Sequence, residues 1–368
     1  MSNPIKILVI SNYTNTISAR PEAEIFLGLK QKGVEITIIT EKDSEYAKKF
    51  EAAGIRVIDG LPKKKNCGKS QELIRNELIQ GKYDALLLYN SKAISNGIKA
   101  AKNLPVKVIL YRGYTGNINW WDPTAYTKYL HPRVNKIICN ANAIQELFER
   151  QLFFKKGKAV TINKGHDLSW YEGIEKTDLT VFGIPDDAFV ITCVANARRM
   201  KGMKYLVKAM DFIPTNLPIH LLLVGTGLDS VEIMNIVSKS PNKDKIHFTG
   251  FRKDGLNIVK SSNAFVLASI KGESITKAVI EAMSLGIAPL ITLIPGNREL
   301  VVNGESGLVV LMKNPKALAE GMVTLYNNPE LCNKYGIQAK ERIKTVFNTQ
   351  QTVEGYFSLL KELQNEVG

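Results

Sequence analysis

The stretch G-E-S-I-T-K-A-V-I-E-A-M-S-L-G-I-A-P, Gly272–Pro289, lies between two apolar runs, Ala264–Ile270 and Leu290–Ile294. Both runs have the composition and length of buried parallel strands. Between them, Lys277–Leu285 has helix-forming composition and ends at Gly286. The order strand, loop, helix, strand predicts one βαβ unit. Its loop leads into the first N–H groups of the helix, which lack partners within the helix and favour a bound anion.

Two carboxylates flank this predicted anion site. Glu273 lies in the loop, and Glu281 follows eight positions later in the helix. This spacing resembles the E-x7-E element of retaining GT-B glycosyltransferases of the family 4 type (glycosyl transferases group 1). Three further stretches also resemble the family. Ile246–Phe251 resembles the strand and turn before the loop that binds the donor, and Pro295–Val310 resembles the strand, loop and hairpin-like segment after that loop. Ala195–Gly202 resembles the family's phosphate-binding element. The resemblance is close in the C-terminal half and extends to the N-terminal half in outline.

The resemblance implies the GT-B fold, in which two doubly wound, Rossmann-like α/β domains face each other across a cleft. The sequence supports two such domains, because apolar runs alternate with helical segments of about ten residues in both halves, as in parallel sheets covered on both faces. We expect an N-terminal acceptor-binding domain from residues 1–172 plus 352–368, with the last helix crossing back as in the family. Residues 173–351 would form a C-terminal nucleotide-sugar-binding domain. Ligands in such sheets bind beyond the carboxyl ends of the strands.

The expected elements follow from the apolar runs and the breaks between them. The strands are 5–10, 34–40, 55–58, 85–89, 106–111, 136–140 and 159–163, then 189–194, 220–224, 246–249, 264–270 and 290–294. The helices are 22–32, 44–53, 70–80, 94–102, 126–130 and 143–151, then 204–210, 230–238, 277–285, 315–326, 329–335, 338–346 and 352–367. Pro21 is expected at the first position of the first helix, where its missing N–H does no harm.

The composition is that of a globular protein of two domains, with 368 residues, 45% apolar and 23% charged. No apolar run approaches the roughly 20 residues of a membrane span. The N-terminal apolar run is expected to be a strand rather than a signal peptide, so we expect a cytoplasmic protein. The four cysteines form no metal-binding pattern, and buried, reduced thiols are expected.

The net charge of +14 indicates an anionic partner. A nucleic-acid protein should interleave aromatic residues with Lys and Arg or show a recognisable module, and neither is present. We therefore expect anionic small molecules or an anionic membrane face, and no nucleic acid. Charge that only aids solubility is the competing explanation.

Cations suited to a diphosphate follow the strand 189–194 at its carboxyl end. Arg198 and Lys201 offer a fork of donors and a point charge, and Arg199 competes with Arg198. Cations at the start of a helix oppose its dipole, so three of them there favour an anion over an ordinary charged surface.

The resemblance assigns further roles by position. Glu273 would lie near the transferred sugar, and Glu281 would accept hydrogen bonds from the ribose. Thr276 stands where many relatives have glycine, and its β-branched side chain disfavours a positive φ. The expected catalytic residues are Glu273, Arg198, Lys201 and His166. The other expected donor-binding residues are Arg199, Gly202, Gly225, Gly250, Phe251, Ser274, Ile275, Thr276, Lys277 and Glu281.

The N-terminal half departs from the family at two loops. The family's Gly-rich loop is replaced by Ser11–Arg20, which contains no glycine, and Y-R-G-Y-T-G at 111–116 stands where relatives often carry a histidine. The expected acceptor-side residues are Asn12, Arg20, Arg112 and Gly113. For Arg112, an ordinary surface arginine is the alternative.

Some features of this half have two interpretations. Lys164–Asp167, K-G-H-D, resembles the family's Asn-Gly-x-Asp linker, and its His166 is either a site residue or a packing residue. Trp120–Pro123, W-W-D-P, is expected to pack in the core, with sugar or lipid contact as the alternative. The basic loop Lys63–Lys69 and the segment Phe153–Lys158 have the composition of an interfacial contact with an anionic membrane, and solubility is again the alternative.

These features predict a hexosyltransferase that moves a sugar from a nucleotide-sugar donor to an envelope glycan or lipid-linked acceptor, with retention of configuration. It would serve lipopolysaccharide or polysaccharide biosynthesis, peripherally at the inner face of the plasma membrane. No D-x-D stands beside a strand end, so no metal or cofactor is expected. The resemblance implies that the donor phosphate helps to deprotonate the acceptor. Two alternatives remain: a sugar-nucleotide epimerase of the same fold, and a non-enzymatic polyanion-binding protein.

Overall fold

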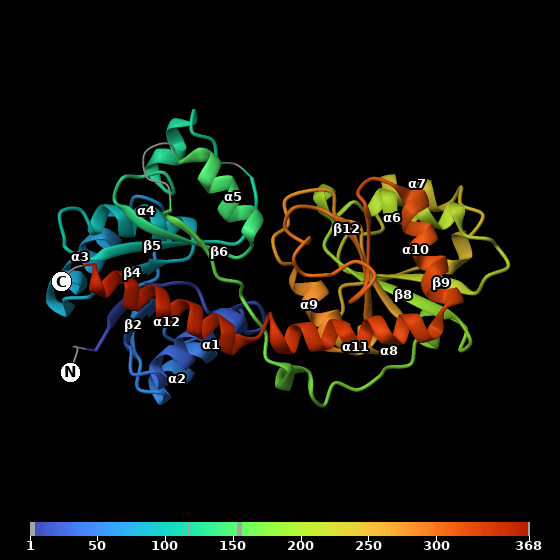
Figure 1. Ribbon diagram of the computed structural model, residues 1–368, viewed down its shortest axis with the longest axis horizontal. Coiled ribbons are helices and arrows are strands. Elements are labelled where there is room, and N and C mark those ends of the chain that lie inside the picture. Colours follow the sequence, from blue (N-terminus) through green and yellow to red (C-terminus); the bar gives the residue numbers. More distant parts are fainter. Residues whose placement is uncertain (1–3, 117, 153–156, 367–368) are drawn as a thin grey trace. The chain divides into compact units, whose positions relative to one another are not determined.

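The computed structural model describes residues 4–116, 118–152 and 157–366 (Figure 1). The chain divides into two compact units: unit 1 comprises 1–165 and 347–368, and unit 2 comprises 166–346. The boundaries expected from the sequence, after 172 and after 351, lie a few residues further along the chain. The first difference involves the 3-10 helix η2 (Leu168–Tyr171), which contacts α9 (Lys277–Ser284) of unit 2.

The described part of unit 1 contains a seven-stranded parallel sheet in the order β3-β2-β1-β4-β5-β6-β7. Its strands are β1 (Lys6–Ile10), β2 (Glu35–Thr40), β3 (Arg56–Asp59), β4 (Ala85–Leu88), β5 (Lys107–Arg112), β6 (Val134–Cys139) and β7 (Ala159–Thr161). The central strands read as nearly continuous apolar runs because helices cover both faces of the sheet. Strand order reverses between β1 and β4, and ligands bind at such a switch point in doubly wound sheets.

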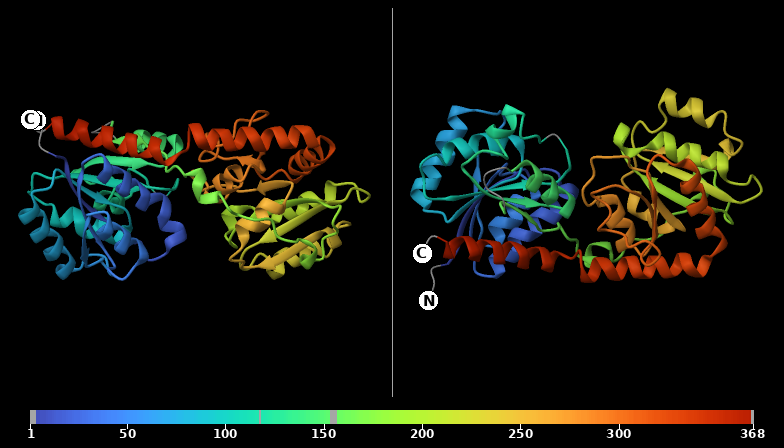
Figure 2. Two further views of the ribbon diagram at one scale, coloured as in Figure 1. Left: turned by 90° about the horizontal axis from the view of Figure 1, so that it is seen from below. Right: turned by 45° about the horizontal axis from the view of Figure 1, so that its top comes forward.

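The C-terminal helix completes the core of unit 1. The helices of this unit are α1 (Thr16–Gln31), α2 (Glu45–Ala52), α3 (Gly68–Gly81), α4 (Ser91–Ala100), α5 (Asn142–Gln151) and α12 (Thr349–Asn365), with the 3-10 helix η1 (Pro123–Thr127). α12 packs along α1 (Figures 1 and 2). Its Val353 and Tyr356 join Phe26 and Leu29 of α1 in one buried cluster.

The first helix begins earlier than expected, at Thr16. The predicted loop Ser11–Arg20 ends at Asn15, whose side chain caps α1 by accepting a hydrogen bond from the N–H of Ser18. Pro21 therefore lies inside the helix, and its predicted place at the first position was wrong. A proline there removes one helical hydrogen bond, and the cap together with a buried apolar face outweighs that loss.

Unit 2 repeats the architecture with a six-stranded parallel sheet in the order β10-β9-β8-β11-β12-β13. Its strands are β8 (Phe189–Val194), β9 (Ile219–Val224), β10 (Ile246–Gly250), β11 (Ala264–Leu267), β12 (Ala288–Leu293) and β13 (Leu308–Leu311). Besides α9, its helices are α6 (Met203–Ala209), α7 (Val231–Val237), α8 (Gly255–Ser261), α10 (Pro315–Asn327) and α11 (Pro329–Thr345). Strand order reverses between β8 and β11, so the loops after these strands lie at the switch point. The predicted α/β fold with two doubly wound, Rossmann-like domains is confirmed.

Two local expectations in unit 2 were wrong, and two elements, α8 and β13, were not predicted. The segment at 295–310 is no hairpin, because β13 pairs in parallel with β12. The two helices expected at 329–335 and 338–346 are one helix, α11, in which Gly336 is needed for close packing: a Cβ there would lie 2.1 Å from the carbonyl oxygen of Gly286. The short helix α8 was missed, since seven residues carry little periodicity.

The state of the cysteines agrees with the expectation from the sequence. None of the four cysteines forms a disulfide, and Cys139, Cys193 and Cys332 are buried. Within the described residues, no helix is both long and apolar enough to cross a membrane.

A pair of histidines makes the stability of unit 2 sensitive to acid. Nδ1 of His220 on β9 lies 2.9 Å from Nε2 of His247 on β10, and the two rings stack. Burial, with smaller effects of His247 and Lys245, lowers the pKa of His220 to about 4, against a weak opposing effect of Asp187. Burial also lowers the pKa of His247, although the carbonyl of Phe182 raises it slightly. Both rings are therefore neutral in the folded protein at pH 7.

Because the folded pKa lies below the unfolded one, this contribution to stability is present above about pH 6.5 and is lost as the pH falls towards 4. We expect the unfolding free energy to drop by on the order of 1–2 kcal/mol more in the parent than in His220→Phe between pH 7.5 and pH 4.5, after allowance for partial solvent access. Urea titrations at both pH values measure the difference. Equal pH dependence of the two proteins would contradict the assignment.

Candidate functional site

The βαβ unit predicted from the sequence is present in unit 2. β11 ends at Leu267, a loop follows, and α9 begins at Lys277. Thr276 is the N-cap of α9 with φ −86°, as its β-branched side chain requires, and it makes no side-chain cap hydrogen bond. The side chain of Thr276 thus accepts no hydrogen bond from the first N–H groups of α9. These N–H groups are suited to bind an anion.

A largely buried ion pair joins the two sequence elements that were expected to bind a diphosphate and a sugar. Nζ of Lys201 lies 2.6 Å from Oε1 of Glu273, and the two side chains are only 13% and 12% exposed. Ser269 Oγ donates to the same carboxylate oxygen at 3.2 Å, and Thr276 Oγ1 lies 3.5 Å from the other. The structure therefore brings Lys201, Glu273 and the start of α9 together.

Two glycines allow the loops after β8, β9 and β11 to touch through their backbones. Gly202 has φ +68°, and a Cβ there would lie 2.0 Å from the carbonyl oxygen of Ala268. Gly225 has φ +148°, and a Cβ there would lie 1.7 Å from the carbonyl oxygen of Ala195. Only glycine combines these backbone angles with such close approach. Both residues thus fix the loops that carry the site.

Asn297 is a site residue that the sequence reasoning missed. It is fully buried, and its Oδ1 accepts a hydrogen bond of 2.8 Å from Oγ1 of Thr276. Its Nδ2 has no hydrogen-bond partner among the described residues. The signal in the sequence was the threonine at a position where relatives have glycine, since a buried hydroxyl needs an acceptor nearby.

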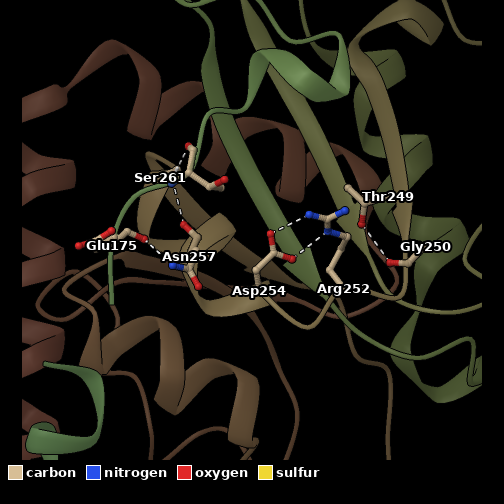
Figure 3. A network of polar contacts seen from close by, with 8 residues as sticks. Glu175, Thr249, Gly250, Arg252, Asp254, Asn257 and Ser261 are labelled. Carbon is tan, nitrogen blue, oxygen red and sulfur yellow. Dashed lines mark hydrogen bonds and ion pairs between the residues drawn. The ribbon is translucent and has the colours of Figure 1, made fainter. Parts of the chain in front are cut away.

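The turn after β10 holds Gly250 and Phe251, two expected donor-binding residues. The N–H of Gly225 donates to the carbonyl of Gly250 at 2.9 Å, which joins this turn to the loop after β9. Phe251 is 72% exposed. Next to it, Arg252 donates to both oxygens of Asp254 at 2.8 and 2.7 Å, an arrangement drawn in Figure 3. A large exposed ring held by a rigid turn is suited to contact a ligand.

The same figure shows how α8 is tied to the start of unit 2. Asn257 Nδ2 donates to the carbonyl of Glu175 at 2.9 Å, and Ser261 Oγ donates to the carbonyls of Thr177 and Asn257 (Figure 3). These bonds fix the helix that follows the Phe251 turn.

The remaining expected donor residues have varied surroundings. Glu281 is the fifth residue of α9 and pairs with Lys277, one turn before it. Ser274 and Ile275 are buried in the loop. Arg198 and Arg199 are exposed and form no ion pair within the described part of the chain; both line a pocket of about 320 Å³.

His166 is buried at the start of unit 2. Its Nδ1 lies 2.5 Å from the hydroxyl of Tyr171, and its ring packs against Trp170 and Tyr171. These contacts give His166 a packing role in η2. A catalytic role for it stays a prediction.

The expected acceptor-side residues all lie in unit 1. Asn12 accepts hydrogen bonds from the N–H and hydroxyl of Thr14, and Arg20 lies within α1. Arg112, at the end of β5, is buried and donates to the carbonyls of Tyr114 and Gly116 at 3.0 and 2.5 Å. Its guanidinium also lies 3.5 Å from the ring centre of Tyr114. Arg112 is thus no ordinary surface arginine, and it shapes the loop that begins at Gly113.

Two other expectations for unit 1 have different outcomes. Trp120 and Trp121 were expected in the core, but they are 50% and 67% exposed, so that expectation was wrong. Of the segment Phe153–Lys158, residues 153–156 lie outside the described residues.

The sequence reasoning also missed a buried ion pair in unit 1. Nζ of Lys164 lies 3.0 Å from Oε2 of Glu22, and Ser11 Oγ donates to Oε1 of Glu22 at 2.5 Å. Lys164 Nζ also lies 4.3 Å from the ring centre of Tyr111. Burial disfavours the charged amine, but Glu22 and Tyr111 outweigh it and raise the pKa of Lys164. The pair joins α1 to the segment after β7 at the carboxyl end of the sheet.

Comparison with known sequences assigns the C-terminal half to a family. Residues 175–342 match glycosyl transferases group 1. An uncharacterised glycosyltransferase of Methanocaldococcus jannaschii is 30% identical over 177 residues, 47% of this chain and 45% of the relative. The UDP-Gal:alpha-D-GlcNAc-diphosphoundecaprenol alpha-1,3-galactosyltransferase of Escherichia coli is 27% identical over 230 residues, 60% of this chain and 58% of the relative. The chain thus spans about half the length of these curated relatives.

Comparison with solved structures shows the fold over nearly the whole chain. A glycosyltransferase from Rickettsia africae has a TM-score of 0.82 at 18% identity, and the match covers 99% of both chains. Anabaena HepE in complex with UDP-glucose has a TM-score of 0.75 at 17% identity, over 97% of this chain and 100% of that one. Residues 175–342 are thus similar to the glycosyl transferases group 1, and the chain as a whole has the GT-B type of fold.

Proposed function

We propose that this protein is a retaining glycosyltransferase that moves a hexose from a nucleotide-sugar donor to an envelope glycan or lipid-linked acceptor. The observation that carries the proposal is the buried Lys201–Glu273 pair beside the N-cap of α9. In this pair a cation suited to bind phosphate lies next to a carboxylate suited to bind sugar hydroxyls. Uridine diphosphate sugars are the first candidates for the donor, because the Escherichia coli relative is named for UDP-Gal and HepE binds UDP-glucose.

Each part of the donor would meet a different group. The diphosphate would take Lys201 from Glu273, and Arg198 and the first N–H groups of α9 would bind its other oxygens. The Glu273 carboxylate would then accept hydrogen bonds from the sugar. Glu281, four residues after Lys277, would accept hydrogen bonds from the ribose.

The reaction that we propose needs no protein nucleophile and no metal. The bond between the anomeric carbon and the donor phosphate oxygen breaks, the acceptor oxygen binds the anomeric carbon on the same face, and the acceptor proton passes to a phosphate oxygen. Negative charge grows on the leaving diphosphate, so Lys201, Arg198 and the α9 N-terminus stabilise the transition state more than the ground state.

A thermal-shift panel of UDP-, GDP- and ADP-sugars tests the proposal. A ligand at 100 times its Kd stabilises a protein by roughly 2.7 kcal/mol, which is easily measured. Stabilisation by none of these sugars would overturn the donor assignment. Incubation with the stabilising nucleotide sugar alone then separates the reactions, since an epimerase converts it to another sugar and a transferase at most hydrolyses it slowly.

Glu281→Gln is expected to weaken UDP binding by about tenfold or more, because the ribose loses a charged acceptor worth roughly 1.5–3 kcal/mol. Calorimetry with UDP measures the change. The matched control is Glu320→Gln. Glu320 is also a helical glutamate four residues after its lysine partner, Lys316, but its side chain is exposed. If both variants bind UDP as the parent does, Glu281 does not bind the ribose.

Contact with an anionic membrane is proposed for unit 1. Lys63, Lys64 and Lys65 are exposed in a loop that Asn96 holds through the carbonyl of Lys64 and the N–H of Cys67. We expect the protein to sediment with anionic vesicles at low salt and not with neutral ones, since each lysine near such a surface contributes about 1 kcal/mol.

The triple variant Lys63→Ala/Lys64→Ala/Lys65→Ala is expected to lose this binding. A control variant, Lys48→Ala/Lys99→Ala/Lys102→Ala, removes the same charge from exposed sites elsewhere in unit 1 and should bind like the parent. Equal sedimentation of parent and triple variant, or none with either vesicle, would make a soluble acceptor the better proposal.

A further inference from the structure

Unit 2 contains a cationic pocket that the proposed donor site does not account for. Its volume is about 320 Å³, within the usual range for small-ligand pockets, roughly 300–1,000 Å³. Arg198 and Arg199 line it, but neither Lys201 nor Glu273 does. The turn from Arg198 to Lys201 therefore presents its arginines to this pocket and Lys201 to the carboxylate of Glu273.

Four cations surround this pocket, and their charge is not balanced by ion pairs among the residues that the structure describes. Besides the two arginines, Lys204 from the first turn of α6 and Lys313 from the loop between β13 and α10 line it. They converge because α6 packs against both α7 and α10. Within the described residues none of these four cations forms an ion pair, and the lining contains one carboxylate, Glu232. Like charges around one cavity repel each other, and a bound anion relieves that repulsion.

The floor of the pocket is apolar. Met203, Leu228 and Ile233 are buried side chains that line it, and Tyr205 stands beside them with the amine of Lys204 5.2 Å from its ring centre. A bare anion would leave this surface in contact with water. The combination fits a ligand that has an anionic group and a compact ring or other apolar part.

The backbone at Lys313 gives independent support. Its φ is +60°, a left-handed conformation that is uncommon for residues other than glycine and costs about 1 kcal/mol relative to glycine. The chain carries a lysine there, with its side chain at the pocket. A strained lysine at the edge of a cationic cavity is an observation that points to a function of the side chain.

We propose that this pocket is a second binding site, for a small organic phosphate, in which Lys204 and Lys313 pair with the phosphate and the apolar floor covers the organic part. Arg198 is shared with the proposed donor site, whereas Lys204 and Lys313 are outside the residues assigned to the donor and carry this proposal.

Phenyl phosphate and inorganic phosphate are suitable probes, titrated into the full chain by calorimetry at low salt. We expect phenyl phosphate to bind more tightly than inorganic phosphate, since only its ring covers the apolar floor. Lys204→Ala/Lys313→Ala should weaken phenyl phosphate binding at least tenfold and change UDP affinity less than twofold.

The matched control is Lys208→Ala/Lys316→Ala, which removes one lysine from α6 and one from the first turn of α10, both outside the pocket lining. It should bind both phenyl phosphate and UDP like the parent, and thermal unfolding checks that all variants fold. If the pocket double variant binds phenyl phosphate like the parent, the site does not exist. If it loses UDP and phenyl phosphate equally, the pocket belongs to the donor site and the proposal is overturned. Failure of every nucleotide sugar to bind, with phenyl phosphate binding intact, would overturn only the proposed function.

Discussion

Lys201→Ala is expected to lower the turnover of sugar transfer by about 10²–10³-fold, as removal of one charge-stabilising donor does at other active sites. The leaving diphosphate loses its point charge when its own charge is growing, so turnover should fall at least as much as nucleotide affinity. Steady-state kinetics with the donor found in the thermal-shift panel measure both. Unchanged turnover would remove Lys201 from the site.

The same substitution should also destabilise the protein, because Glu273 would be left charged and buried without its ion-pair partner. Breaking a buried pair in this way costs roughly 3–5 kcal/mol. The double variant Lys201→Ala/Glu273→Gln removes that charge, so it should recover stability but not turnover. Lys208→Ala, on the exposed face of α6, is the control for loss of a nearby lysine. Recovery of turnover by the double variant would show that Lys201 only neutralises Glu273.

Gly202→Ala is expected to destabilise unit 2 by about 3 kcal/mol or more, the sum of left-handed backbone strain and a forced shift of a packed loop. A Cβ at this position would lie 2.0 Å from the carbonyl oxygen of Ala268. The shift would move Lys201, the preceding residue, so nucleotide affinity should fall as well. Denaturant titration and UDP calorimetry measure the two effects.

Gly250→Ala is the matched control for this prediction. Its φ of +66° nearly equals the +68° of Gly202, but a Cβ there would meet nothing within 4 Å. The control should therefore lose only about 1 kcal/mol from strain. If both variants are destabilised equally, close approach of the loops plays no part and glycine is needed at 202 for its φ alone.

The sequence by itself determined the fold and the elements that carry the site. The apolar runs predicted the parallel strands of both units except β13, because strands buried on both faces must be apolar throughout. The βαβ unit around α9 was predicted to within three residues at each end of its strands and helix, since these elements are defined by local composition and by Gly286. The cations after β8 could be named from their place at a strand end, whereas the two glutamates were named from the resemblance of their spacing to the E-x7-E element.

Helix ends were less predictable, because competing local signals exist there. Pro21 looked like the start of α1, whereas the cap at Asn15 and the buried face of the helix outweighed it. Two helices were expected at 329–335 and 338–346, whereas α11 continues through Gly336, which allows close contact with Gly286. In both places packing decided between two local possibilities.

Only the tertiary structure decided which side chains meet. The pairs Lys201–Glu273 and Lys164–Glu22 join residues far apart in the chain, and Asn297 reaches Thr276 from the loop after the next strand. The same holds for the pocket, where Lys204 and Lys313 come together through the packing of α6 against α10. Sequence periodicity fixes which face of an element is buried, but the partner of a buried charge depends on which loops the strand order brings to one edge of the sheet.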